Sequence, residues 1–209
     1  MNTMLLTHRS CLEHDAGLGH PECPERLQAV LAALETEEFY LLDRQEAPQA
    51  DIEQIARVHR RAYIDYVFSV VPQKGHYGLD DDTAICPASG EAALRAAGAV
   101  VAAVDAIMAG RVRNAFCAVR PPGHHAEPGH AMGFCLFNNV AIGAEHARKA
   151  YGLSRVAVID FDVHHGNGTQ SMFEHDPDLL YASTHQWPLY PATGAPKGCG
   201  DYGNIVIAL

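Results

Sequence analysis

The stretch Arg155-Val-Ala-Val-Ile-Asp-Phe-Asp-Val-His-His-Gly166 decides the fold. Its first half is almost continuously apolar and rich in β-branched residues, which is typical of a strand covered on both faces in a parallel sheet. Polar residues follow at once, and in open α/β sheets functional sites gather at the carboxyl ends of the strands. The stretch therefore predicts an α/β fold with a site where this strand ends.

Side chains alternate along an extended chain, so Asp160, Asp162 and His164 should point to one side. Phe161 and Val163 should point to the other side, into packing. A carboxylate and an imidazole can be two ligands of a zinc ion, but a catalytic zinc usually has three protein ligands, so a third must come from elsewhere. The alternative is a strand end that is merely capped by polar side chains, which are costly to place there without a partner ion.

Further strands and helices are expected both before and after this stretch in the chain. Further strands are expected at Met4–Thr7, Ala115–Val119, Leu179–Thr184 and Asn204–Leu209, and helices from Pro24, after Asp51, and at Ala62–Val70, Ser89–Ala109 and Asn138–Tyr151. The alternation of strands and helices predicts one three-layer αβα domain over residues 1–209, with a mostly parallel central sheet. Because the last residues lie in an apolar strand, we expect the C-terminal part of the domain to be missing and the open edge to promote self-association.

Composition excludes several classes of protein. The 209 residues carry 15 Lys and Arg against 25 Asp and Glu, a net charge of −10, which argues against a nucleic-acid surface. No stretch approaches the roughly 18–20 apolar residues of a membrane span. Six cysteines lie far apart, which predicts reduced thiols in a cytoplasmic protein. Nucleotide-binding glycine motifs and the GxSxG elbow of serine hydrolases are absent from the sequence.

A second polar segment, Arg120-Pro-Pro-Gly-His-His-Ala-Glu127, also follows a short apolar strand. On a loop rich in Pro and Gly, His124 and His125 can converge on one water, and neutral imidazole is the natural general base at neutral pH. The alternative is a solvated loop, which is the preferred interpretation for Glu127. In a third segment, Arg26 lies in the first turn of a helix, where the helix dipole disfavours a cation, so an anionic partner is expected.

Together these segments resemble the histone deacetylase family of zinc amidohydrolases, and the resemblance covers nearly the whole chain. The matching text is HPECPERL at 20–27, RPPGHHAEPGHAMGFCLFNN at 120–139, VIDFDVHHGNGTQ at 158–170, SerThrHis at 183–185, and the loop at 190–194. Class II and bacterial deacetylase-like amidohydrolases are the most similar in style, since Asn167 stands where class I enzymes carry Asp. The implied fold is of the arginase/deacetylase type.

The resemblance implies that zinc-activated water removes acetyl groups from acetyl-lysine of proteins or from small acetylated amines such as polyamines. Asp162 and His164 are the implied zinc ligands, and His124 and His125 are the implied general acid/base pair. Beyond the substrate, the resemblance names no partner, and the oligomeric state stays open.

Three further residues are implied to support this chemistry. Asp160 would hydrogen-bond His124 and increase its basicity, and Asn167 would orient His125. Asp160 and Ser183 would also line a structural potassium site.

The substrate-binding residues follow from the same resemblance. Phe134, with Gly133 beside it, and Tyr190 would wall a narrow acyl-lysine tunnel. Arg26 would lie in an inner channel for acetate. One of the three aspartates at 80–82 would hold the substrate backbone at the rim.

The sequence departs from the family pattern in one respect. In the family a third zinc ligand, an Asp, and the oxyanion-stabilising Tyr or His follow later in the chain than residue 209. Catalysis by the isolated 209-residue chain is therefore doubtful, and a metal- or acyl-lysine-binding fragment is the alternative. A binuclear manganese hydrolase of the arginase type is a third possibility, against which the single tight cluster with tandem His speaks.

Overall fold

The computed structural model describes residues 3–195 and 200–208. Its strands are β1 (Thr3–Thr7), β2 (Asp43–Glu46), β3 (Tyr77–Gly78), β4 (Ala84–Ile85), β5 (Asn114–Cys117), β6 (Val156–Asp160), β7 (Leu179–Thr184) and β8 (Ile205–Ala208). Its helices are α1 (Ser10–Glu13), α2 (Pro24–Ala33), the 3-10 helix η1 (Glu37–Phe39), α3 (Ile52–Ile55), α4 (Arg61–Ser69), α5 (Ser89–Met108), α6 (Asn139–Tyr151) and α7 (Asn167–Phe173). Cys199 and Leu209, which belong to the predicted thiols and the predicted last strand, lie outside the described residues.

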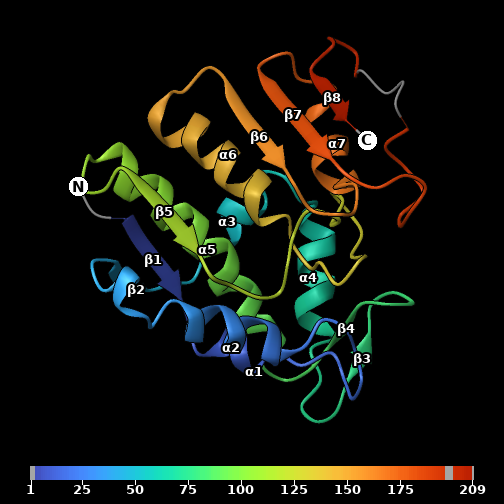
Figure 1. Cartoon of the computed structure of the whole chain (residues 1–209). Helices are drawn as coiled ribbons and strands as arrows, with labels where there is room; N and C mark the ends of the chain where they lie inside the picture. Colours follow the sequence, from blue (N-terminus) through green and yellow to red (C-terminus); the bar gives the residue numbers. More distant parts are fainter. Residues whose placement is uncertain (1–2, 196–199, 209) are drawn as a thin grey trace.

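The strands form two parallel three-stranded sheets, in the orders β2-β1-β5 and β6-β7-β8, and β3 and β4 form a small antiparallel pair (Figure 1). Parallel pairing was expected. The parallel strands are divided between two sheets, because among the described residues β5 pairs only with β1 and β6 pairs only with β7. The strands β5 and β6 therefore each present an edge.

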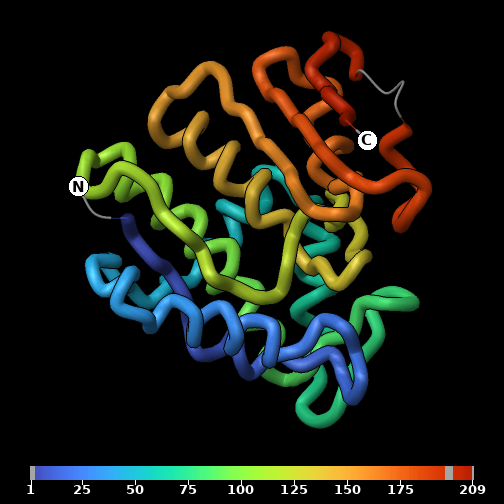
Figure 2. The backbone as a smooth tube through the Cα atoms, in the orientation of Figure 1, coloured from blue at the N-terminus to red at the C-terminus, as the bar shows by residue number. Residues whose placement is uncertain are grey.

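The first sheet is the middle of three layers. Met4 and Leu6 of β1 pack with the alanine-rich face of α5, whereas Leu5 packs with Leu27 of α2 on the other side. This is the alternation that a buried strand requires. In Figure 2 the blue N-terminal segment runs beside the yellow-green β5, although more than a hundred residues separate them in the chain; Met4 is paired with Ala115.

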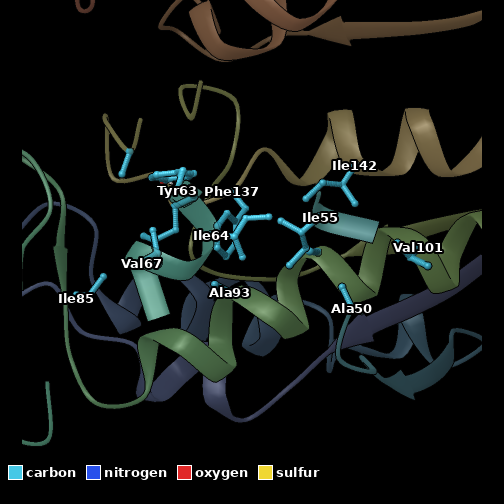
Figure 3. Close-up of a cluster of buried hydrophobic side chains, with 13 residues drawn as sticks. Ala50, Ile55, Tyr63, Ile64, Val67, Ile85, Ala93, Val101, Phe137 and Ile142 are labelled. Carbon is cyan, nitrogen blue, oxygen red and sulfur yellow. Dashed lines mark hydrogen bonds between the residues drawn. The ribbon is translucent and has the colours of Figure 1, made fainter. Parts of the chain in front are cut away.

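The largest cluster of buried apolar side chains contains no residue of the two parallel sheets. It joins α3, α4, α5 and the segment that leads into α6 (Figure 3). Tyr63 on α4 and Phe137 before α6 meet edge to face, with ring centroids 5.9 Å apart. This core holds the loop 118–138 against α4, and that loop carries His124 and His125.

The second sheet is covered on one face only. Val158 of β6 packs with α6 and α7, but Ile159 is 63% exposed, Phe161 87% and Val163 51%. The prediction of a strand covered on both faces, with Phe161 and Val163 in packing, is therefore wrong. The physical reason is that no helix in the described part of the chain packs over this face. Self-association through the open edge of the last strand stays a prediction.

Helix boundaries follow local chemistry. Asp51 and Gln54 form a capping box at α3, the Asn138 side chain caps α6, and Gly152 ends it, as predicted. The polar edge strand β2 was not predicted, and neither was α7. The residues of β2 are polar and mostly exposed, so they show no apolar pattern from which a strand could be predicted. Gly166 and Gly168 flank Asn167, and glycine disfavours helix, so the start of α7 could not be predicted from residue preferences.

Two predictions from composition can be compared with the structure. Over residues 3–195 and 200–208, no helix is long and apolar enough to cross a bilayer. The free thiols Cys11, Cys23, Cys86, Cys117 and Cys135 agree with the prediction of reduced cysteines. A cytoplasmic location stays a prediction.

Candidate active site

A pocket of about 470 Å³ is lined by residues of the loops that follow β5 and β6. Predicted residues dominate its wall, which includes Arg26, His124, His125, Gly133, Phe134, Asp162, His164 and Tyr190. The two remaining predicted residues, Asp160 and Asn167, stand behind His124 and His125 and contact them. The structure therefore brings all the predicted catalytic, substrate and metal residues together.

Two other hollows differ from this pocket in chemistry. One of about 530 Å³, around Leu42 and Phe116, is apolar and carries a single carboxylate, Glu38. The other, of about 590 Å³, is a groove along the edges of β5 and β6 that shares His124 and Asp162 with the pocket. Only the pocket combines several imidazoles, carboxylates and aromatic rings, as a catalytic site requires.

His124 is oriented by the end of β6. Its Nδ1 lies 2.9 Å from Asp160 Oδ2, and the same oxygen accepts a hydrogen bond from the Tyr181 hydroxyl at 3.0 Å. Burial alone would raise the pKa of Asp160, but the hydrogen bond and charge of His124 outweigh it and lower the pKa. An ionised carboxylate only accepts hydrogen bonds, so Nδ1 of His124 is the donor and Nε2 is free for the pocket.

His125 is oriented by the start of α7. Its Nδ1 lies 2.9 Å from Oδ1 of Asn167, and its ring centroid lies 4.0 Å from that of His124. Burial, and after it the charge of His124, lower the pKa of His125 to about 4. His125 is therefore uncharged at neutral pH and can accept a proton.

Asp162 and His164 lie next to each other at the pocket. The backbone N–H of His164 donates to Asp162 Oδ1 at 2.8 Å, and Nδ1 of His164 lies 3.5 Å from that oxygen. Both side chains are partly exposed. One carboxylate and one imidazole suit zinc. Across the described ranges, however, no group of three His, Cys, Asp or Glu side chains is arranged to hold a metal ion.

Two aromatic side chains form part of the pocket wall. The Phe134 ring packs edge-on against His20, with centroids 4.7 Å apart. Tyr190 stands perpendicular to His125 at 5.0 Å and to His164 at 5.9 Å. Both residues line the pocket, and their role as tunnel walls stays a prediction.

Glycines allow the backbone to approach the histidine loop closely. A Cβ at Gly133, where φ is +56°, would lie 2.3 Å from Cδ2 of His125. A Cβ at Gly168, in α7, would lie 2.2 Å from the carbonyl oxygen of Ala126. Both distances are far below van der Waals contact, so only glycine fits at these two positions.

Of the three candidate rim aspartates, Asp82 is the one that lines the pocket. Its Oδ1 accepts the backbone N–H of Gly133 at 3.1 Å, which ties the rim to the pocket wall. Burial, with the nearby Asp82 and Asp80 carboxylates, raises the pKa of Tyr190, so its phenol stays protonated. Asp80 instead lies 3.4 Å from His130.

The anionic partner of Arg26 is Glu22, at 3.6 Å, and this carboxylate has a stronger partner that the sequence did not suggest. Buried Arg120 donates from Nε to one Glu22 oxygen, and from its second terminal nitrogen to the other at 2.6 Å. Its first terminal nitrogen donates to the carbonyls of Cys11 at 2.7 Å and His14 at 2.9 Å. Through these hydrogen bonds Arg120 connects the N-terminal segment that contains Cys11, His14 and Glu22 to the segment that carries His124 and His125.

We expect Arg120→Leu to lower the free energy of unfolding by about 3–5 kcal/mol, because it removes the bidentate partner of the buried Glu22 carboxylate and leaves only the longer contacts with His14 and Arg26. Urea denaturation followed by circular dichroism measures the change. The matched control is Arg9→Leu, which breaks the exposed ion pair with Glu13 and should cost at most about 1 kcal/mol. Equal losses in the two variants would contradict the assignment.

The same ion pair predicts a pH dependence. Burial alone would raise the pKa of Glu22, but hydrogen bonds from His14 and Arg120 outweigh it and lower the pKa to about 2, from an ordinary value of 4.5. A lowered pKa means that the stabilisation is complete above about pH 4.5 and is lost as the pH falls towards 2. Urea midpoints at pH 6, 4 and 3 should show this loss, and Glu22→Gln should reduce it. A pH-independent midpoint in the wild type would contradict the pairing.

The implied potassium site stays a prediction. Ser183 of β7 is the register partner of Asp160 of β6, so the two residues are neighbours. The Ser183 hydroxyl lies 2.8 Å from Nδ1 of His185.

Comparison with known proteins identifies the family. A sequence model of the histone deacetylase domain matches residues 20–207. The histone deacetylase-like amidohydrolase of Pseudomonas aeruginosa is 41% identical over 190 residues, covering 90% of this chain and 49% of that protein. The polyamine deacetylase HDAC10 of Rattus norvegicus is 41% identical over 189 residues, covering 83% of this chain and 32% of that protein.

A solved structure agrees. The crystal structure of the HDA15 HD domain matches with a TM-score of 0.93 at 35% identity, covering 99% of this chain and 62% of that one. The fold is thus the three-layer α/β arrangement of the arginase/deacetylase type, and the chain spans about a third to two thirds of the length of these relatives. From its sequence, fold and site, the chain belongs to the histone deacetylase family.

Proposed function

We propose that this chain carries the proton-transfer centre of a zinc-dependent deacetylase that hydrolyses the amide of an acetylated amine. The observation that supports this most strongly is the pair of adjacent imidazoles, His124 and His125, with ring centroids 4.0 Å apart and each Nδ1 hydrogen-bonded behind the pocket wall. Asp162 and His164 share the same pocket.

Asp162 and His164 are the proposed zinc ligands, with a third ligand supplied from outside the described residues. When bound, zinc supplies Lewis-acid polarisation of the acyl carbonyl and makes water a better proton donor. Asp160 and Ser183 are the proposed residues of a structural potassium site.

The histidines move the protons. As water adds to the acyl carbon, one proton passes to Nε2 of a neutral imidazole, for which His125 is suited by its lowered pKa. The C–N bond then breaks, and the pair returns a proton to the departing nitrogen. Asp160 and Asn167 hold the two rings in place during both transfers. The products are acetate and a free amine.

The pocket wall suits an acylated alkylamine. Phe134 and Tyr190 offer flat apolar surfaces to an extended methylene chain, and Asp82 at the rim offers an acceptor to an amide or ammonium N–H. Arg26 lines the same pocket, and its guanidinium group offers a positive charge that would bind the acetate product. Acetyl-lysine of proteins is the first candidate; the relative named a polyamine deacetylase supports small acetylated amines as the second.

The test is turnover of a fluorogenic acetyl-lysine amide and of an acetylated polyamine by the full gene product, with zinc counted by elemental analysis. We expect acetate release and one zinc per chain. Binding of metal or of acyl-lysine without turnover would establish the alternative, a binding fragment, and two metals per chain would favour an arginase-type centre. Residues 1–209 alone should bind zinc weakly and be inactive, because they bring two ligands together.

A further inference from the structure

The amide of Asn167 has two ends in different surroundings. Oδ1 faces Nδ1 of His125 at 2.9 Å. Nδ2 faces three acceptors: the Glu127 carboxylate at 2.9 Å, the Met132 sulfur at 3.3 Å and the carbonyl oxygen of His125 at 3.4 Å. Of these three, only Glu127 is charged and within a strong hydrogen-bond distance.

An amide differs from a carboxylate in a way that matters here. Asp160 presents oxygens in either orientation, so the Nδ1 proton of His124 is secured whichever way the carboxylate turns. Asn167 presents an oxygen or an NH₂ group, depending on how its amide is turned. If the amide turned over, NH₂ would face Nδ1 of His125, and the ring would have to carry its proton on Nε2.

We propose that Glu127 is a positioning residue that sets the tautomer of His125 through Asn167. By accepting from Nδ2, the carboxylate keeps Oδ1 turned towards Nδ1, so the proton stays on Nδ1 and Nε2 presents a lone pair to the pocket. We call the hydrogen-bonded series Glu127–Asn167–His125 the relay. Its importance for catalysis rests on the proposed function, whereas the tautomer of His125 can be measured whether or not the protein is a deacetylase.

The loop around Glu127 is built to hold the carboxylate in place. The backbone of Glu127 is paired with that of His130, with a hydrogen bond of 3.0 Å. The next carbonyl, of Pro128, accepts the Arg60 N–H at 2.7 Å at the start of α4. On the other side, Gly168 of α7 presses against Ala126. The distance between Glu127 and Asn167 is therefore fixed by the backbone on both sides.

The test is ¹⁵N NMR of the histidines in the metal-free chain at neutral pH, where two-bond couplings show which ring nitrogen carries the proton. The signals of His125 are assigned by their loss in His125→Ala. In the wild type we expect Nδ1–H at both His124 and His125. In Glu127→Leu, His125 should shift towards Nε2–H while His124 stays unchanged, which makes His124 an internal control.

Two more variants separate the relay from a structural role of the loop. Glu127→Gln retains an acceptor oxygen and should restore Nδ1–H at His125. His130→Ala changes the same turn without touching Asn167 and should behave like the wild type. An Nε2–H tautomer in the wild type, or an unchanged His125 in a folded Glu127→Leu protein, would overturn the proposal.

In the active enzyme, Glu127→Leu should lower kcat by about ten- to a hundredfold with little change in KM, and Glu127→Gln should recover most of the loss. If the protein has no deacetylase activity, the proposed function fails, while the tautomer measurement still decides the role of Glu127. If activity is present and both variants retain full kcat, the catalytic part of the relay is wrong.

Discussion

His125→Ala should slow hydrolysis of an acetyl-lysine amide by about 10²–10⁴-fold, and His124→Ala should have an effect of the same order. Each imidazole is proposed to carry a proton at Nε2, and a water molecule in its place is a much weaker proton acceptor. Neither residue is proposed as a metal ligand, so both variants should keep the zinc content of the wild type. The measurements are kcat and zinc per chain on the same preparation.

The matched control for this pair is His130→Ala. His130 lies five residues from His125, on the same loop, but its imidazole faces Asp80 at 3.4 Å. It should retain wild-type kcat. Loss of zinc from His124→Ala or His125→Ala would move those residues into the metal site and contradict their assignment as proton carriers.

Asp162→Ala should abolish both tight zinc binding and turnover, and His164→Ala should do the same. A catalytic zinc rarely stays bound through fewer than three protein ligands, so the loss of either donor leaves a site too weak to fill at cellular metal concentrations. Elemental analysis after dialysis measures the zinc, and circular dichroism confirms that the variants are folded.

Asp81→Ala is the control for Asp162→Ala. Asp81 is an exposed carboxylate from the rim loop, and its removal changes the net charge by the same amount. It should keep zinc and activity. An Asp162→Ala protein that still holds a full equivalent of zinc would exclude the proposed site.

Sequence reasoning succeeded where the signal is local. The strand at 156–160 follows from a run of β-branched residues, and the ends of α6 follow from Asn138 and Gly152. It failed for the surroundings of that strand, because apolar side chains show a preference for burial and do not show which element covers them. Ile159 and Phe161 are exposed for this reason.

The candidate site, like the fold, has parts that could be predicted from the sequence and parts that could not. The residues of the two histidine segments were predicted, since their order along the chain carries the chemistry. The partnerships of Arg120 with Glu22 and of Glu127 with Asn167 join residues 98 and 40 positions apart, and no local spacing encodes them. Glu127 was interpreted as a solvated charge for this reason, and only the folded chain reveals its contact.

Because the backbone approaches neighbouring atoms so closely at Gly133 and Gly168, the positions around the pocket differ in how many substitutions they can accept. In a library that randomises the pocket, only glycine would survive selection at these two positions, because any side chain would collide with His125 or with the Ala126 carbonyl. Tyr190, by contrast, lines the pocket with its ring, in the space where the proposed acyl chain would lie. Directed evolution towards longer or bulkier acyl groups would therefore accumulate changes at the aromatic wall and leave the proton carriers in place.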